Sequence, residues 1–394
     1  MSYLESEKIV FINNERLLNS GKNELEEWLS GCLYNAFYEA RKNKLNTINE
    51  QLFEVHREQE LINLTRDIIN RVYTPSSSVA FIITEPTPRE IFAAPFRDRV
   101  VHHFLIQQNG DFWNKRLSHR SFSCRQGKGT LYGINCLKKD IINVSRQYTE
   151  DAWVMKIDLQ GYFMSLSRKY LFERVCWGLD RQFPLKGPIY EVCKYLWYET
   201  IFDNPIDNVK IKGAPDDWDI LPLSKSMFNS KPGHGIVIGN LTSQWLSNMA
   251  LDTFDRFVVH DLGIKQYGRY VDDAYFVART KEELLYVRPL IEDYIKKLGL
   301  VVHPKKFYLQ SVHRGVSFLG VVIYPGRVVL GRRFCKNMRI LKSKIEEDGL
   351  SVANIESVRA YSGLAKHFNY KKTMNKNIGK NNLKNVRKWY SSVS

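Results

Sequence analysis

The chain has 394 residues, 44% of them hydrophobic, and this length allows two or three packed units that share a sizeable core. A formal net charge of +16 and a pI near 9.4 make a polyanion the first partner to consider. The sequence has no apolar run of membrane-spanning length, no leader-like N-terminus in Met-Ser-Tyr-Leu-Glu-Ser-Glu-Lys, and no C-x-x-C pair among its six cysteines. We therefore expect a cytoplasmic protein with no membrane partner, no zinc site and reduced core thiols.

The first quarter of the chain changes from a helical to a strand-like pattern. Apolar residues three and four positions apart predict helices over Glu24–Tyr73. The β-branched stretch Val79–Thr84 and the prolines around it predict strands and turns, and a helical pattern resumes near Arg97.

A single acid ends the next predicted strand, Trp153–Ile157, at Asp158. An acid in this position usually forms a turn or caps a helix. Ser167 is the better cap for the helix predicted at about 168–180, so Asp158 is free for another task.

A long insertion precedes a glycine-bearing segment. Residues 203–235 are rich in Asp, Pro, Asn and Gly and predict a loop inserted into the core domain, with a functional role or local disorder. In the following segment, Gly239 before Thr242 would let the backbone approach a base pair while a helix packs behind it. Taken alone, this segment is better explained by an ordinary helix start.

Two adjacent acids, Asp272 and Asp273, interrupt an alternating apolar and aromatic run over 268–278, as in a hairpin. Neighbours on a strand point to opposite faces, so both carboxylates can converge on a cation only at a tight turn. An ordinary solvated turn is the alternative, although it seldom has strand-forming residues on both sides. With Asp158 the pair makes three carboxylates, enough to hold two Mg²⁺ ions about 3.5–4 Å apart for phosphoryl transfer.

The basic charge is concentrated at the C-terminus. Residues 331–394 hold 15 Lys and Arg against 4 Asp and Glu, a net charge of +11. Five aromatic residues are interleaved with these cations: Tyr361, Phe368, Tyr370, Trp389 and Tyr390. A solvated tail is one explanation, and the aromatic residues favour a folded, helical surface that faces phosphates.

Together these motifs resemble the reverse transcriptase family, in the family's order and over about residues 25–375. The segments that resemble the palm motifs, the lysine-bearing motif and the primer grip are Asp158–Phe163, Ile238–Gln244, Tyr270–Asp273, Leu298–Lys306 and Val316–Gly320. Upstream segments that resemble the fingers and a bacterial element are Pro88–Ile91, Phe96–His103 and Arg125–Thr130.

The resemblance implies an α/β right-hand polymerase with a ferredoxin-like palm of antiparallel sheet and helices. Its implied parts are an N-terminal helical extension at 1–75, fingers at 76–150, a palm at 151–325 with the inserted loop 203–235, and a small basic helical thumb at 326–394. The implied catalytic residues are Asp158, Asp272, Asp273 and Lys306, with Lys305 as the alternative general acid. Two Mg²⁺ ions, or Mn²⁺ in their place, would be held by Asp158, Leu159, Asp272 and Asp273. The implied nucleotide-binding residues are Arg89, Arg97, Phe163, Ile238, Gly239 and Gln244, and the primer grip is Phe318, Leu319 and Gly320.

Two positions depart from the commonest family pattern. Retroviral and most intron-encoded enzymes carry Gln where Ile238 stands and Pro where Gln244 stands. This form, with Tyr361–Asn369, resembles the subgroup of diversity-generating retroelement enzymes and defence-associated bacterial reverse transcriptases. It implies a bacterial enzyme that copies a dedicated structured non-coding RNA into DNA from dNTPs, with an accessory protein or as a homo-oligomer. The insertion favours antiphage defence, and mutagenic synthesis in a retroelement is the alternative.

Two further classes compete with this interpretation. RNA-dependent RNA polymerases share the palm and the metals, but they generally carry an acid or a small polar residue where Phe163 stands. An aromatic ring there would exclude a ribose 2′-hydroxyl. The other class is a nucleic-acid-binding protein with an inactive palm, and the presence of all three carboxylates argues against it.

Overall fold

The computed structural model describes residues 16–18, 21–42, 48–84, 87–368 and 370–393, and divides into two compact units. Unit 1 contains Met1–Cys124, Leu159–Asp261 and Glu292–Val302, and unit 2 contains Arg125–Asp158, Leu262–Ile291 and His303–Ser394. The expectations for the first eight residues and for Asn369 lie outside the described residues. Each unit is therefore assembled from segments that are far apart in the sequence.

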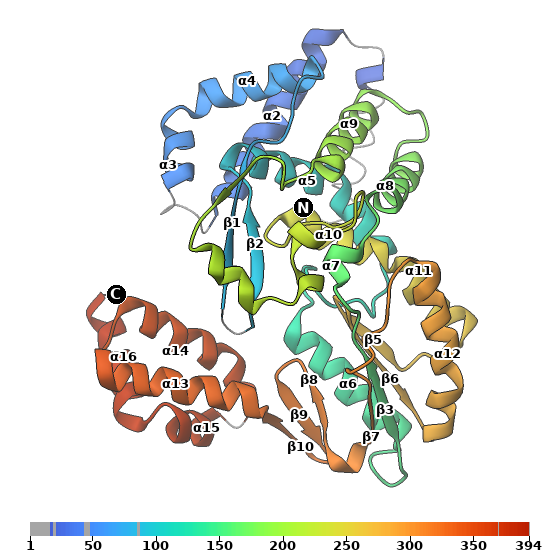
Figure 1. Ribbon diagram of the computed structural model, residues 1–394, viewed down its shortest axis with the longest axis vertical. Helices are drawn as coiled ribbons and strands as arrows, with labels where there is room; N and C mark the ends of the chain where they lie inside the picture. Colours follow the sequence, from blue (N-terminus) through green and yellow to red (C-terminus); the bar gives the residue numbers. More distant parts are fainter. Residues whose placement is uncertain (1–15, 19–20, 43–47, 85–86, 369, 394) are drawn as a thin grey trace. The chain divides into compact units, whose positions relative to one another are not determined.

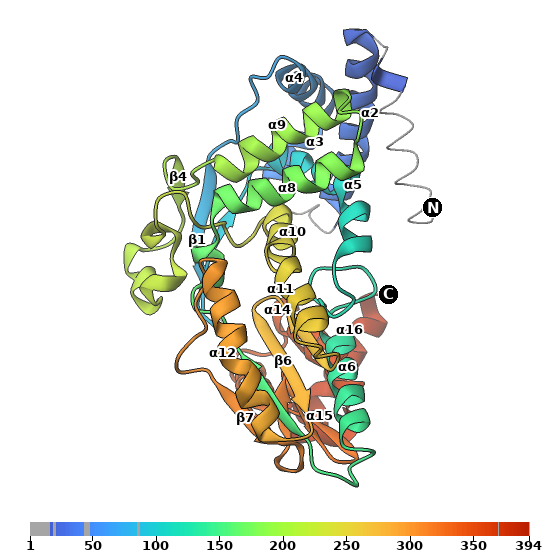
Figure 2. The same cartoon turned by 90° about the vertical axis from the view of Figure 1, so that its right-hand side faces the viewer.

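Unit 1 is mainly helical, because its apolar residues recur at helical spacing. Its first helices are α2 (Lys22–Arg41), α3 (Ile48–Val55), α4 (Arg57–Ile69) and α5 (Phe96–Arg116), as the sequence predicted. Helix α5 packs on the N-terminal helices through aromatic pairs, with ring centroids 5.8 Å apart for Phe37 and Phe96. Helices α8 (Arg168–Gln182) and α9 (Pro188–Phe202) lie side by side (Figure 2). The Ser167 hydroxyl accepts a hydrogen bond from the Tyr170 amide, which confirms the predicted cap of α8.

The small sheet of unit 1 joins the predicted strand region to the insertion (Figure 1). Strand β1 (Ser78–Ile83) pairs antiparallel with β2 (Arg89–Ala93) and parallel with β4 (Val209–Ile211). The insertion also contains three short 3₁₀ helices, Pro215–Ile220, Leu223–Lys225 and Met227–Asn229. It is therefore a structured segment rather than an irregular loop.

The single helix predicted from Thr242 to Val259 is divided in the structure. Helix α10 (Leu241–Ala250) is followed by α11 (Asp252–Arg256) and by a π-helical turn, Phe257–Asp261. Asp252 begins α11 and is almost fully buried, and its carboxylate pairs with Arg174 of α8 at 3.1 Å. The break thus occurs where a buried charge is paired with an arginine from another helix.

Unit 2 is built on a four-stranded antiparallel sheet in the order β5-β6-β3-β7. The strands are β5 (Tyr267–Tyr270), β6 (Asp273–Ala278), β3 (Trp153–Ile157) and β7 (Tyr308–Ser311). Helix α6 (Thr130–Val144) is fixed to this sheet by a buried hydrogen bond from the Tyr275 hydroxyl to the Asp140 carboxylate. The boundary between the two units falls within helix α12 (Lys281–Lys297), after Ile291. A second sheet of unit 2 contains β8 (Val316–Phe318), β9 (Val321–Tyr324) and β10 (Arg327–Leu330).

The C-terminal part of unit 2 is a bundle of four helices (Figure 1). They are α13 (Arg332–Asp348), α14 (Val352–Ala365), α15 (Tyr370–Asn377) and α16 (Lys380–Val393), which confirms the predicted basic helices. Phe368 is buried, and Tyr361 packs edge-on against Phe334 with the ring centroids 5.0 Å apart. The Phe368 ring therefore packs between the helices and is not part of the predicted phosphate-facing surface, which stays a prediction.

Two expectations about the whole chain can be compared with the described residues. None of their helices combines the length and the apolar character that crossing a bilayer requires. All six cysteines are free thiols, but only Cys193 is buried and Cys124 is exposed. The prediction that the six thiols lie in the core is therefore confirmed only for Cys193.

Packing between α5 and α8 gives a test of the unit 1 core. A Cβ atom added at Gly178 would lie 2.7 Å from the ring of the buried Trp113, whereas one at Gly31 of α2 would meet nothing within 4 Å. Gly178→Ala should lower the free energy of unfolding by about 1–3 kcal/mol. Gly31→Ala should leave it unchanged or raise it by up to about 1 kcal/mol. Chemical denaturation of both variants measures the difference, and equal effects would contradict this packing.

Candidate active site

The three predicted catalytic carboxylates come together on the main sheet of unit 2. Asp158 directly follows β3, and Asp273 begins β6. The antiparallel register pairs Ile157 with Ala274, so the next position along each strand brings Asp158 beside Asp273. This backbone pairing joins two acids that are more than one hundred residues apart in the sequence.

The third acid, Asp272, lies in the turn between β5 and β6. Tyr270 pairs with Asp273, which leaves Val271 and Asp272 as a two-residue turn and confirms the predicted hairpin. Val271 has a φ of +58°, a conformation that costs a β-branched residue about 1–2 kcal/mol. The buried Arg269 donates a hydrogen bond of 2.7 Å to the Val271 carbonyl and supports this strained turn.

The carboxylates repel one another strongly. Burial, as the largest cause, together with the charges of Asp158 and Asp273 and against the opposing effect of Lys306, raises the pKa of Asp272 to about 7. Burial and Asp158 also raise the pKa of Asp273, while Lys156 and Lys306 lower it. The site therefore carries more negative charge than its own lysines neutralise, which favours binding of a cation.

Lys306 is the nearest of these cations to the acids. Its ammonium group forms an ion pair with the Asp158 carboxylate. The backbone ties the same segments together, because the His303 amide donates to the Asp158 carbonyl at 2.8 Å. Lys305, by contrast, is linked through its amide to the His303 ring.

The chemistry of this donor set fits a hard divalent cation, since carboxylate oxygens are the ligands that Mg²⁺ prefers. Asp158, Asp272 and Asp273 supply these oxygens, and their mutual repulsion is the charge that a cation would relieve. Among the residues that the structure describes, no cluster of three His, Cys, Asp or Glu side chains has the arrangement of a metal site. Asp158 is instead oriented toward the Lys306 ammonium group.

Three of the predicted nucleotide-binding residues gather around strand β2 of unit 1. The Ile238 carbonyl accepts a hydrogen bond of 2.9 Å from the Phe92 amide. Gly239 has a φ of +130°, and a Cβ atom there would lie 2.5 Å from the Phe92 carbonyl oxygen, so only glycine fits. Phe163 lies in the short helix α7 (Tyr162–Ser165), and its carbonyl accepts from the Ile236 amide at 3.0 Å.

The other predicted nucleotide-binding residues are placed separately within unit 1. Arg89 is exposed at the start of β2, and Gln244 is exposed on α10. Arg97 is already engaged: it donates to Asp67 at 2.9 Å and lies over the Tyr73 ring, 4.8 Å from its centroid. A triphosphate would have to compete with these contacts.

The predicted primer grip forms the hairpin between β8 and β9 of unit 2. Phe318 pairs with Val321, so Leu319 and Gly320 form a two-residue turn with φ values of +44° and +87°. Positive φ at both central positions is the pattern of a type I′ turn. Phe318 is buried edge-on against Tyr275, with the centroids 5.2 Å apart. A primer can therefore reach the exposed turn, whereas the Phe318 ring belongs to the core.

Three charged residues at these sites were not predicted. Lys156 lowers the pKa of Asp273, Arg269 supports the Val271 carbonyl, and the buried Glu90 accepts hydrogen bonds from the inserted segment. Each of them interrupts an apolar or aromatic strand pattern in the sequence. A charge at such a position must find a partner, and this is the signal that could have identified them.

Comparison with known proteins identifies the family. A family model described as Reverse transcriptase (RNA-dependent DNA polymerase) matches residues 86–323, a span that includes every predicted site residue. A search of curated proteins found no match. The chain belongs to the reverse transcriptase family.

Membership defines the general reaction. The protein is an RNA-directed DNA polymerase, a nucleotidyltransferase that uses an RNA template, a DNA primer and dNTPs. Reverse transcriptases generally use divalent metal ions for this reaction. The expectation of a reverse transcriptase is thus confirmed at the level of the family.

The raised pKa of Asp272 predicts a pH-dependent response to metal. The folded protein holds this proton more tightly than the unfolded chain, so the metal-free protein should lose stability as the pH rises from about 4 to about 7. Mg²⁺ competes with that proton, so its stabilising effect should be larger at about pH 8 than at about pH 6. Melting temperatures with and without Mg²⁺ measure this. An equal shift at both pH values would contradict the charge repulsion described above, and Asp272→Asn should remove most of the pH dependence.

Proposed function

We propose that this chain synthesises DNA at Asp158, Asp272 and Asp273 with two Mg²⁺ ions, for which Mn²⁺ can substitute. The observation that carries the proposal is the placement of the three carboxylates across β3 and β6, where burial and the charges of Asp158 and Asp273 raise the pKa of Asp272 to about 7. When bound, the ions would supply the positive charge that the primer 3′-hydroxyl and the triphosphate require. Leu159, which directly follows Asp158, completes the proposed set of metal ligands.

Lys306 is proposed as the general acid that gives a proton to the departing pyrophosphate. Its ion pair with Asp158 supports Lys306 over Lys305, because the paired ammonium group lies at the acidic site. An ammonium group at this position can donate a proton when negative charge develops on a leaving group.

The remaining site residues are assigned to the two substrates. Phe163 would stack beneath the deoxyribose and exclude a 2′-hydroxyl, while Ile238 and Gly239 would contact the templating pair. Arg89, Arg97 and Gln244 are assigned to the incoming nucleotide, and the turn Leu319–Gly320, with Phe318 behind it, to the primer.

The proposed subdomains are those that the resemblance to the family implies. The order β5-β6-β3-β7, with every pair antiparallel, is that of a ferredoxin-like sheet and supports a palm at 151–325. The fingers are assigned to 76–150 and the N-terminal extension to 1–75. The four-helix C-terminal bundle supports a basic thumb at 326–394.

The proposed biological role is antiphage defence in a bacterium. Ile238 and Gln244 have the form of the subgroup that contains the defence-associated enzymes, and the structured insertion at 203–235 supports the same choice. The template would be a dedicated structured non-coding RNA, with an accessory protein or a second copy of the chain as partner. Mutagenic synthesis in a diversity-generating retroelement is the other candidate.

Substitution of the acids tests the catalytic assignment. Asp272→Asn and Asp158→Ala should each reduce Mg²⁺-dependent dNTP incorporation on an RNA template by at least about 10³-fold, because each removes a charge that stabilises the transition state. RNA binding should stay close to that of the unchanged protein and both variants should remain folded, and Asp219→Asn in the exposed part of the insertion is a matched control. Near-normal synthesis by either variant would refute the assignment.

Phe163→Val tests the choice of sugar. With the ring removed, incorporation of ribonucleotides relative to deoxyribonucleotides should rise by roughly ten- to a hundredfold, because the 2′-hydroxyl is admitted. Single-nucleotide extension with each substrate measures the ratio. An unchanged ratio would remove Phe163 from this role and favour RNA synthesis as the reaction.

The biological role needs a test in the native host. Sequencing the nucleic acid that co-purifies with the protein should identify a single non-coding RNA and its DNA copy. Plaque counts should rise when Asp272→Asn replaces the native residue. Products with dense substitutions and unchanged plaque counts would instead favour the retroelement.

A further inference from the structure

Both ends of the inserted segment 203–235, here called the insert, are fixed by one buried arginine. Arg168 donates from its side chain to the Asp203 and Gly235 carbonyls, each at 3.0 Å, and to the Asn204 side chain at 3.2 Å. Losing this guanidinium would leave buried acceptors unpaired at both ends. The insert therefore leaves and re-enters the fold at a single fixed point beside α8.

The middle of the insert is fixed by a buried carboxylate. Glu90 of β2 is fully buried and accepts three hydrogen bonds, all from the insert. Their donors are the Trp218 indole N–H at 2.6 Å, the Ser226 hydroxyl at 2.8 Å and the Met227 amide at 2.5 Å. A buried carboxylate is stable only with such donors, so it holds the insert in one position on β2.

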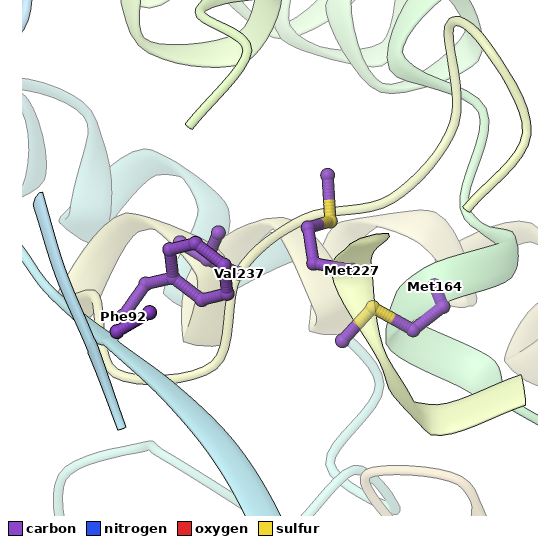
Figure 3. Close-up of a cluster of buried hydrophobic side chains, with 5 residues drawn as sticks. Phe92, Met164, Met227 and Val237 are labelled. Atoms are coloured by element: carbon purple, nitrogen blue, oxygen red, sulfur yellow. The ribbon is translucent and has the colours of Figure 1, made fainter. Parts of the chain in front are cut away.

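This position brings the insert against the residues proposed to contact the nucleotide. Met227 belongs to a buried apolar cluster whose other members come from separate segments: Ala80, Phe92, Met164 and Val237 (Figure 3). Phe163 and Ile238 are partly buried and pack on this cluster, as does Trp218. The insert also contacts the turn before Phe163, since a Cβ atom at Gly161 would lie 2.5 Å from the Ser224 carbonyl oxygen.

From these contacts we propose that the insert is a specificity element that holds Phe163 and Ile238 in position for choosing deoxyribonucleotides. The inference rests on the proposed role of Phe163. One side of that ring is supported by the cluster that Met227 completes, and the turn before it rests on the insert. Glu90 and Trp218 act as positioning residues, through the insert and not by touching the nucleotide. Discrimination by shape depends on sub-ångström placement, since a displacement of about 1 Å can change a rate by about 10²-fold.

Trp218→Phe is the test, because it keeps a smaller aromatic ring and removes the N–H group that donates to Glu90. The matched control is Trp197→Phe, which removes the indole hydrogen bond to Asn109 at 2.8 Å elsewhere in unit 1. Both variants should lose stability, and Trp197→Phe at least as much, because the Trp197 ring is fully buried whereas the Trp218 ring is partly buried. Only Trp218→Phe should raise the ribonucleotide-to-deoxyribonucleotide ratio of kcat/KM, by roughly three- to tenfold and mainly through the KM for the dNTP.

Ser226→Ala is a milder second variant, for use if Trp218→Phe folds poorly. It should change the ratio in the same direction. Primer–template affinity should be unchanged in all three proteins. An unchanged ratio in both insert variants, or an equal change in Trp197→Phe, would overturn the inference. Phe163→Val, measured alongside, separates the two proposals. If it changes the ratio while the insert variants do not, only this inference fails, and if it does not change the ratio, the proposed role of Phe163 fails.

Discussion

The repulsion among Asp158, Asp272 and Asp273 is the constraint on which the arrangement of unit 2 depends. Three carboxylates on adjacent strands oppose folding unless positive charge lies nearby. Lys306 and Lys156 supply part of this charge: both lower the pKa of Asp273, and Lys306 lowers that of Asp272, which still lies at about 7. The protein thus keeps an unfavourable cluster of acids that a divalent cation would stabilise.

The backbone at the acidic site is also strained. Val271 adopts a left-handed conformation that β-branched residues avoid, and the buried Arg269 holds its carbonyl. Such strain persists only where surrounding contacts fix it, and it is common at functional sites. The hairpin needs this geometry because an extended chain would direct Asp272 and Asp273 to opposite faces of the sheet. The strained turn and the raised pKa therefore have the same origin.

Unit 1 uses buried charge for a different purpose. Arg168 and Glu90 each make three hydrogen bonds with the insert, so a long polar segment becomes a fixed part of the fold. Through Met227 the insert is part of the buried apolar cluster on which Phe163 and Ile238 pack. In unit 2 the three carboxylates keep an excess of negative charge, which we propose is used to bind cations. In unit 1 the buried charges are hydrogen-bonded to the insert and fix its position. This contrast supports the division between catalysis and selection that we propose.

Local patterns in the sequence were sufficient to predict several of the helices and strands and to locate the three acids. Period-two alternation around Asp272 and Asp273 predicted the hairpin, and Ser167 predicted the start of α8, because both depend on neighbours in the chain. The family and the α/β class also followed from the order of short motifs, which does not require knowledge of long-range contacts. Only the tertiary structure decided the partners of Glu90, Arg168 and Arg269, and showed that Phe368 packs inside the helical bundle. These partners lie far away in the sequence, and a buried charge or ring is specified by whichever residues surround it in three dimensions.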